Sequence, residues 1–184
     1  MEHRIADDAV QLIVLHSRHP VEAPLISVFS DLQADWPMYE ARRLDTVLKQ
    51  QANLALFAAV LARKGSISVC TAGDIRVHLA WGDRLRETTR DHTYATDPLF
   101  EREGQGMDPT MRAAVATRGI GSGSTAGPEL VHWRAPDDYA VIVCSSEVHR
   151  HRPPAAYLDD LLCGASDPLM NTSGVLSILK QSPL

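Results

Sequence analysis

The sequence has few cysteines, no long apolar run and no surplus of basic residues, and each absence excludes a class of protein. Its three cysteines, Cys70, Cys144 and Cys163, are an odd number and form no Cys-x-x-Cys motif. Cys70 and Cys144 lie inside apolar runs, where a free thiol behaves as a small hydrophobic group. We therefore expect buried, reduced thiols rather than a disulfide framework.

Membrane and nucleic-acid partners are disfavoured as well. No apolar run approaches the roughly 18 residues that a membrane helix needs. The formal net charge of −5 argues against nucleic acid as a partner. The first ten residues, MEHRIADDAV, are acidic and lack the basic and apolar regions of a signal peptide. Together with the reduced cysteines, these features predict a cytoplasmic protein without a membrane or nucleic-acid partner.

The composition is that of a globular domain. With 184 residues, 45% of them hydrophobic and 22% charged, the chain is expected to form a single domain, 1–184. Short apolar runs between turn residues predict strands at 9–15, 25–29, 54–61, 67–71, 75–81, 130–133, 139–144 and 175–179. Helical spacing and helix-start signals predict helices at 39–51, 108–116 and 153–163. Strands outnumber helices and the helices are separated, which indicates an α+β fold.

The most informative stretch is 53–92. The runs 54–61 and 67–71 flank a turn at Arg63-Lys64-Gly65, and the run 75–81 lies between turns at Gly73-Asp74 and Gly82-Asp83. Three apolar runs joined by short turns predict a meander of antiparallel strands.

Several motifs follow one another in and after this stretch: GDIR at 73–76, WGD at 81–83, TTRDH at 88–92, VATRGIG at 115–121 and PDDYAVIVCSSE at 136–147. Their order resembles the metal-dependent 2C-type (PPM) serine/threonine protein phosphatases, which carry GDSR, RDG, LTxDH, LTRALG and a strand ending in SDG. The resemblance implies two packed antiparallel β-sheets flanked by helices, in a compact version of the family fold.

Members of this family use two Mn²⁺ or Mg²⁺ ions and a bridging water to hydrolyse phosphoserine or phosphothreonine in proteins. The family's NED, DG, SDG and DN motifs are matched by residues 6–8, 31–32, 145–147 and 173–174, and the resemblance implies that the central metal ligands fall at Asp7, Asp31, Ser146 and Ser173. Hard divalent cations prefer carboxylate oxygens, and two of these four positions hold a neutral hydroxyl instead. We therefore expect no metal or only weak Mn²⁺ or Mg²⁺ binding, and assign no catalytic residue.

Other residues can compensate for the lost carboxylates. Glu147 follows Ser146, and Asp167 precedes Ser173, so either can supply a replacement ligand. For phosphate binding, the resemblance suggests Arg4, one residue from the family position. Arg150, in the basic run that follows the lost SDG motif, is a second candidate.

The basic run 149–152 (HRHR), which contains Arg150, allows three interpretations: it binds phosphate, it closes the pocket with ion pairs, or it is a solvated loop. Asp74 and Arg76 are expected to shape a turn, and Asp91 and His92 to organise structure.

The leading hypothesis is a degenerate PPM-type protein, a pseudophosphatase that acts as a protein-binding or regulatory module. By analogy with the family, its partner is a serine/threonine kinase or a phosphoprotein. The alternative is an active, divergent metal-dependent phosphatase that uses Asp7, Asp31 and either Glu147 or Asp167. A third hypothesis is an accidental resemblance in an unrelated α+β sandwich.

Overall fold

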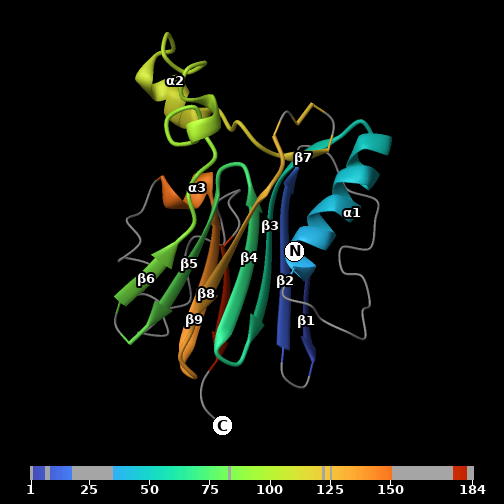
Figure 1. The fold of residues 1–184 in the computed structure, drawn as a ribbon, viewed down its shortest axis with the longest axis vertical. Helices are drawn as coiled ribbons and strands as arrows, with labels where there is room; N and C mark the ends of the chain where they lie inside the picture. Colours follow the sequence, from blue (N-terminus) through green and yellow to red (C-terminus); the bar gives the residue numbers. More distant parts are fainter. Residues whose placement is uncertain are drawn as a thin grey trace.

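The computed structural model describes residues 2–6, 9–17, 35–82, 84–121, 123–124, 126–150 and 176–181. Within these residues, two antiparallel sheets pack face to face, and helix α1 covers the outer face of one of them (Figure 1). The predicted class, α+β with two packed antiparallel sheets and flanking helices, is confirmed.

The first sheet has the strand order β1-β2-β3-β4-β8, and a short strand, β7, also pairs with β3. Its strands are β1 (Glu2–Ala6), β2 (Ala9–Ser17), β3 (Leu54–Arg63), β4 (Ser66–Ala72), β7 (Ile120–Gly121) and β8 (Glu129–Arg134). The second sheet has the order β10-β9-β5-β6. Its strands are β5 (Ile75–Trp81), β6 (Arg84–Thr88), β9 (Tyr139–Ser145) and β10 (Leu176–Gln181). The predicted strands at 9–15, 130–133, 139–144 and 175–179 correspond to β2, β8, β9 and β10.

The core between the sheets comes from alternate residues of the strands, because successive side chains of a strand point to opposite faces. Val77 and Leu79 of β5 and Val141 of β9 are fully buried and pack against residues of the first sheet such as Val60 and Val69. This apolar layer joins the sheets and fixes where their ends lie.

Helix α1 (Trp36–Gln50) confirms the predicted helix at 39–51 but begins three residues earlier. Pro37 occupies its first turn, where a missing backbone N–H costs no hydrogen bond. Ala41, Leu44 and Leu48 follow helical spacing and are fully buried against the first sheet, which includes Phe57 in β3. A second apolar layer therefore lies between α1 and the first sheet.

The predicted meander is right at its first turn and wrong at its second. β3 and β4 form a hairpin in which Arg63 pairs with Ser66. β5, however, pairs with β9 and β6 in the other sheet, so Gly73-Asp74 carries the chain from one sheet to the other. Gly73 has φ +93°, and a Cβ there would lie 2.4 Å from Leu56 Cδ2. Apolar runs look alike in sequence whether they are hydrogen-bonded neighbours or stacked across a core.

Beyond β6 the chain forms a small lobe, which we define as residues 94–116. It contains a 3-10 helix, η1 (Pro98–Phe100), and helix α2 (Pro109–Ala114). Asp108 caps α2 as predicted: its Oδ1 accepts hydrogen bonds from Thr110 N at 2.9 Å and Met111 N at 3.3 Å. The helix ends two residues before the predicted limit of 116. The predicted strand at 25–29 and helix at 153–163 lie outside the described residues.

Candidate functional site

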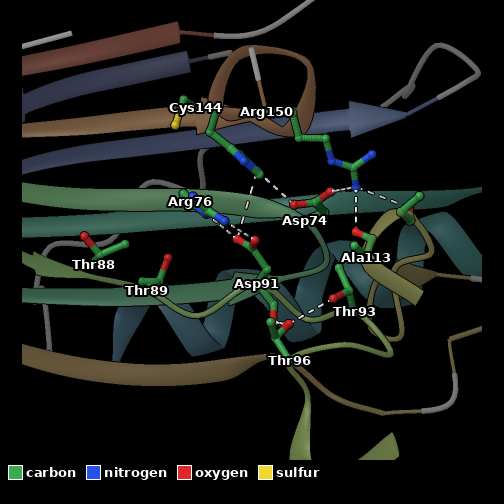
Figure 2. Close-up of polar contacts among 12 residues, drawn as sticks. Asp74, Arg76, Thr88, Thr89, Asp91, Thr93, Thr96, Ala113, Cys144 and Arg150 are labelled. Carbon is green, nitrogen blue, oxygen red and sulfur yellow. Dashed lines mark hydrogen bonds and ion pairs between the residues drawn. The ribbon is translucent and has the colours of Figure 1, made fainter. Parts of the chain in front are cut away.

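Five charged or titratable residues meet at one end of the second sheet: Asp74, Arg76, Asp91, His149 and Arg150, which we call the Asp74 cluster. The topology brings them together. Asp74 directly precedes β5, helix α3 (Ser146–His149) directly follows β9, and Ile75 pairs with Ser145. The start of one strand and the end of its neighbour therefore lie at the same edge, where Figure 2 shows the side chains converging.

Arg76 and Asp91 form a two-pronged ion pair. Arg76 Nε donates to Asp91 Oδ1 at 2.6 Å, and Nη2 donates to Oδ2 at 2.5 Å. The hydrogen bonds that Arg76 donates to Asp91 raise the pKa of Arg76 above its ordinary value. The backbone carbonyl of Asp91 also accepts a hydrogen bond from Thr96 Oγ1 at 2.5 Å, which ties the ion pair to the base of the lobe (Figure 2).

Asp74 is only 3% exposed and has both carboxylate oxygens occupied. His149 Nε2 lies 2.8 Å from Oδ1, and Arg150 Nη2 donates to Oδ2. The same Nη2 donates to the backbone carbonyls of Ala113 at 3.0 Å and Ala114 at 3.3 Å, at the end of α2 (Figure 2). A buried carboxylate without such partners would be strongly destabilising, so these contacts make its burial tolerable.

The charges of the cluster are balanced. The two carboxylates of Asp74 and Asp91 face the two guanidinium groups of Arg76 and Arg150, so the charges of these four side chains sum to zero. The ligand atoms of Asp74, Asp91 and His149 lie within 4.8 Å of one another, close enough to surround a cation. Each carboxylate oxygen is already taken by an N–H group, however. The guanidinium groups of Arg76 and Arg150 already neutralise these carboxylates and would repel a divalent ion, so this donor set does not fit Mn²⁺ or Mg²⁺.

No family model matches the sequence, and no curated protein matches it. Solved structures do match. One is PppA, "a key regulatory component of T6SS in Pseudomonas aeruginosa", with 20% identity over 86% of this chain and 74% of that chain, at a TM-score of 0.64. Another is the serine/threonine phosphatase Stp1 from Staphylococcus aureus, with 12% identity over 95% of this chain and 84% of that chain, also at 0.64.

A third match is the catalytic domain of the serine/threonine protein phosphatase PstP in complex with two manganese ions. It shows 16% identity over 88% of this chain and 76% of that chain, at a TM-score of 0.59. The chain has the PPM phosphatase fold. The hypothesis of an accidental resemblance in an unrelated sandwich is therefore wrong, while the low identities leave the activity to be argued from the site.

Among the four ligand positions expected from the PPM motifs, the structure describes Ser146. It is the first residue of α3 and is half-buried, one residue beyond the Ile75–Ser145 pair and thus at the same end of the sheet as Asp74. Asp7, Asp31, Ser173 and the substitute Asp167 lie outside the described residues, as do the side chains of Glu147 and Arg4. Their predicted roles remain predictions.

The pairing of β1 with β2 bears on the predicted ligand Asp7. Ala6 pairs with Ala9, and Ala9 pairs with Arg63 at the hairpin end of the first sheet. Ala72, which precedes the Asp74 cluster, lies at the opposite end of that sheet, where it pairs with Phe57. The two residues that flank Asp7-Asp8 in sequence are therefore at the other end of the sandwich from Ser146.

Arg150 forms an ion pair with Asp74, as one interpretation of the basic run expects. His149 lies within hydrogen-bond distance of the same carboxylate and its side chain is 1% exposed, so the solvated-loop interpretation is wrong for His149. His151 and Arg152 lie outside the described residues. Phosphate binding by Arg150 stays a prediction. Asp74 and Arg76 do more than shape a turn, since both form ion pairs. Sequence motifs indicated Asp74, Asp91 and the basic run separately, but no spacing rule joins residues 75 positions apart.

A buried histidine–cysteine pair lies on the same sheet but is inert. His78 Nε2 lies 3.5 Å from Cys144 Sγ, and His78 Nδ1 lies 2.9 Å from Thr88 Oγ1. Burial lowers the pKa of His78 to about 4 and raises the pKa of Cys144 to about 12. The thiol therefore stays protonated at neutral pH and is not a nucleophile. Cys70 and Cys144 are both free and buried, as predicted, and Cys163 lies outside the described residues.

Proposed function

We propose that this protein is a degenerate PPM-type pseudophosphatase, a protein-binding regulatory module in serine/threonine phosphorylation signalling. The proposal rests on Ser146, which the motif match puts at a metal-ligand position of the family, and on the ion pairs that Arg76 and Arg150 form with the carboxylates at the same end of the sheet. A two-metal hydrolase needs concentrated negative charge to hold its ions and its bridging water. The described end of this sheet offers a neutral hydroxyl and a balanced cluster instead.

The partner we propose is a protein, namely a serine/threonine kinase or a phosphoprotein. The structural neighbour PppA is called a key regulatory component of T6SS, which supports a regulatory rather than a metabolic role. We place the protein in the cytoplasm as part of the same proposal. In the part of the chain that the structure describes, no helix has the length and apolar character needed to cross a membrane.

The proposal is tested by assaying hydrolysis of p-nitrophenyl phosphate and of a phosphothreonine peptide with Mn²⁺. We expect no turnover above that of buffer containing Mn²⁺ alone. Robust, metal-dependent turnover that is abolished by Asp31→Asn would refute the proposal and establish the active-phosphatase alternative. In calorimetric titration with Mn²⁺, weak or undetectable binding supports a pseudophosphatase, whereas two tightly bound ions support an enzyme.

A further inference from the structure

The lobe 94–116 has no apolar core of its own. Neither η1 nor α2 contains a buried residue, and Leu99 and Met111 are 64% and 54% exposed. In Figure 1, α2 projects beyond the end of the sheets, away from the sandwich. Since hydrophobic burial is the main force that fixes an element in a fold, α2 must be held in place by other contacts.

Polar contacts hold the base of the lobe to the sandwich. His92 N donates to Gly73 O at 3.1 Å, and Thr117 N donates to His92 O at 2.8 Å. Asp97 accepts hydrogen bonds from Thr117 Oγ1 at 2.8 Å and from Arg118 Nε at 2.6 Å. These bonds fix the two chain segments that enter and leave the lobe, but they do not contact α2.

Among the hydrogen bonds of the described residues, those that join α2 itself to the sandwich come from Arg150. Its Nη2 donates to the carbonyls of Ala113 and Ala114 and to the carboxylate of Asp74. The last carbonyls of a helix have no partner within the helix, and a cation is favourable at that negative end. One guanidinium nitrogen therefore bridges a helix end and a buried carboxylate.

We infer that Arg150 is a latch that holds α2 against the sandwich and lets α2 open while the bonds to Asp97 keep the base of the lobe in place. The acceptor side of the latch is rigid, because Asp74 is buried and also held by His149. The donor side is accessible, because the Arg150 side chain is 39% exposed. Opening breaks these hydrogen bonds without exposing a core, so it costs less than global unfolding.

The latch also connects the lobe to the candidate site. Arg150 N donates to Ser146 O at 3.1 Å, which closes the last turn of α3. A ligand that draws the Arg150 side chain away from Asp74 would therefore release α2 directly beside the turn that carries Ser146. This coupling does not depend on whether the protein hydrolyses phosphate.

The test is amide hydrogen exchange on the full chain, with Arg150→Met compared with wild type. Methionine keeps an unbranched apolar stem and removes every donor. The amides of Arg112 and Val115, which bond to Asp108 O and Met111 O within α2, are expected to exchange at least about tenfold faster. Amides of the β3–β4 hairpin are expected to exchange at their wild-type rates once any change in the free energy of global unfolding is taken into account. Arg102→Met, an exposed change on the same lobe, is the matched control and is expected to change neither set.

Unchanged exchange of the α2 amides in Arg150→Met would overturn the latch. If that variant does not fold, Arg150→Gln, which keeps a shorter donor, is expected to give a smaller acceleration, and no acceleration would count equally against the inference. Wild-type protein supplies an independent measurement. In low urea, the opening reaction that exposes the α2 amides is expected to have a lower free energy than the opening reaction that exposes the amides of β3 and β4. Equal opening free energies for α2 and the hairpin would show that α2 is no separate unit and would also refute the latch.

Discussion

The apolar layers and the Asp74 cluster are both buried, but they are stabilised in different ways. In the layers, residues such as Phe57 and Leu79 can be replaced by other apolar side chains of similar volume, because such side chains fill the same space. In the cluster, each carboxylate oxygen of Asp74 and Asp91 has a specific partner. Loss of one member leaves a buried charge unpaired. The comparison shows that the apolar layers stabilise the fold as a whole, while the cluster fixes the positions of the charged side chains at one end of the second sheet.

The largest expected effect is in the apolar layers. Phe57→Ala, at a fully buried position beneath α1, is expected to lower the free energy of unfolding by about 3–5 kcal/mol, because the truncation leaves a cavity. Urea unfolding followed by circular dichroism measures this loss. Leu54→Ala in the same strand is the control: its side chain is exposed, and the expected change is within about 0.5 kcal/mol. Similar losses in both variants would contradict the assignment of the layer as core.

In the cluster, Asp74→Ala is expected to cost about 3 kcal/mol, because His149 and Arg150 lose their buried partner. Urea unfolding of the single variant, of Arg150→Met and of the double variant measures the coupling between the two residues. The double variant is expected to lose clearly less than the sum of the singles. Strict additivity would show that the ion pair is energetically irrelevant. Asp137→Ala, at an exposed turn position, is the control.

The base of the lobe gives a pH-dependent prediction. Burial alone raises the pKa of Asp97, but hydrogen bonds from Arg118 and Thr117 outweigh it and hold the pKa at about 2. A folded pKa below the unfolded value stabilises the protein above the unfolded pKa, and the contribution is lost as pH falls through the folded pKa. The stability gap between wild type and Asp97→Asn is therefore expected to be full at pH 7 and to shrink between about pH 4 and pH 2. A gap independent of pH would contradict the ionised pair.

The smallest expected effect is at the cap of α2. Asp108→Ala removes the oxygen that accepts from Thr110 N and Met111 N, and is expected to cost about 1 kcal/mol of local helix stability. Hydrogen exchange of α2 is the appropriate measurement, because the lobe has no core through which the loss would spread to the sandwich. Faster global unfolding with unchanged α2 exchange would contradict this local role.

Much of the fold follows from the local pattern of the sequence. Helix α1, the β3–β4 hairpin, the Asp108 cap and strands β8, β9 and β10 all coincide with predicted elements, because hydrophobic spacing and turn residues determine local conformation. The wrong element was the meander. Whether β5 pairs with β4 or crosses to the other sheet depends on contacts with β9, more than sixty residues away in sequence, and no local signal reports them.

In the candidate site, too, some features follow from the sequence alone and others depend on contacts between distant residues. The sequence by itself determined that residue 146, close to the end of the strand predicted at 139–144, carries a hydroxyl, since residue identity needs no structure. Only the tertiary structure decided that Asp74, Asp91 and His149 meet, and that Arg76 and Arg150 neutralise the carboxylates. The physical reason is that ion pairing depends on distances of a few ångströms between residues from separate strands and turns. Those distances are set by the pairing of β5 with β9 in the second sheet, which brings Asp74 and the residues after β9 to the same edge, and not by the order of residues along the chain.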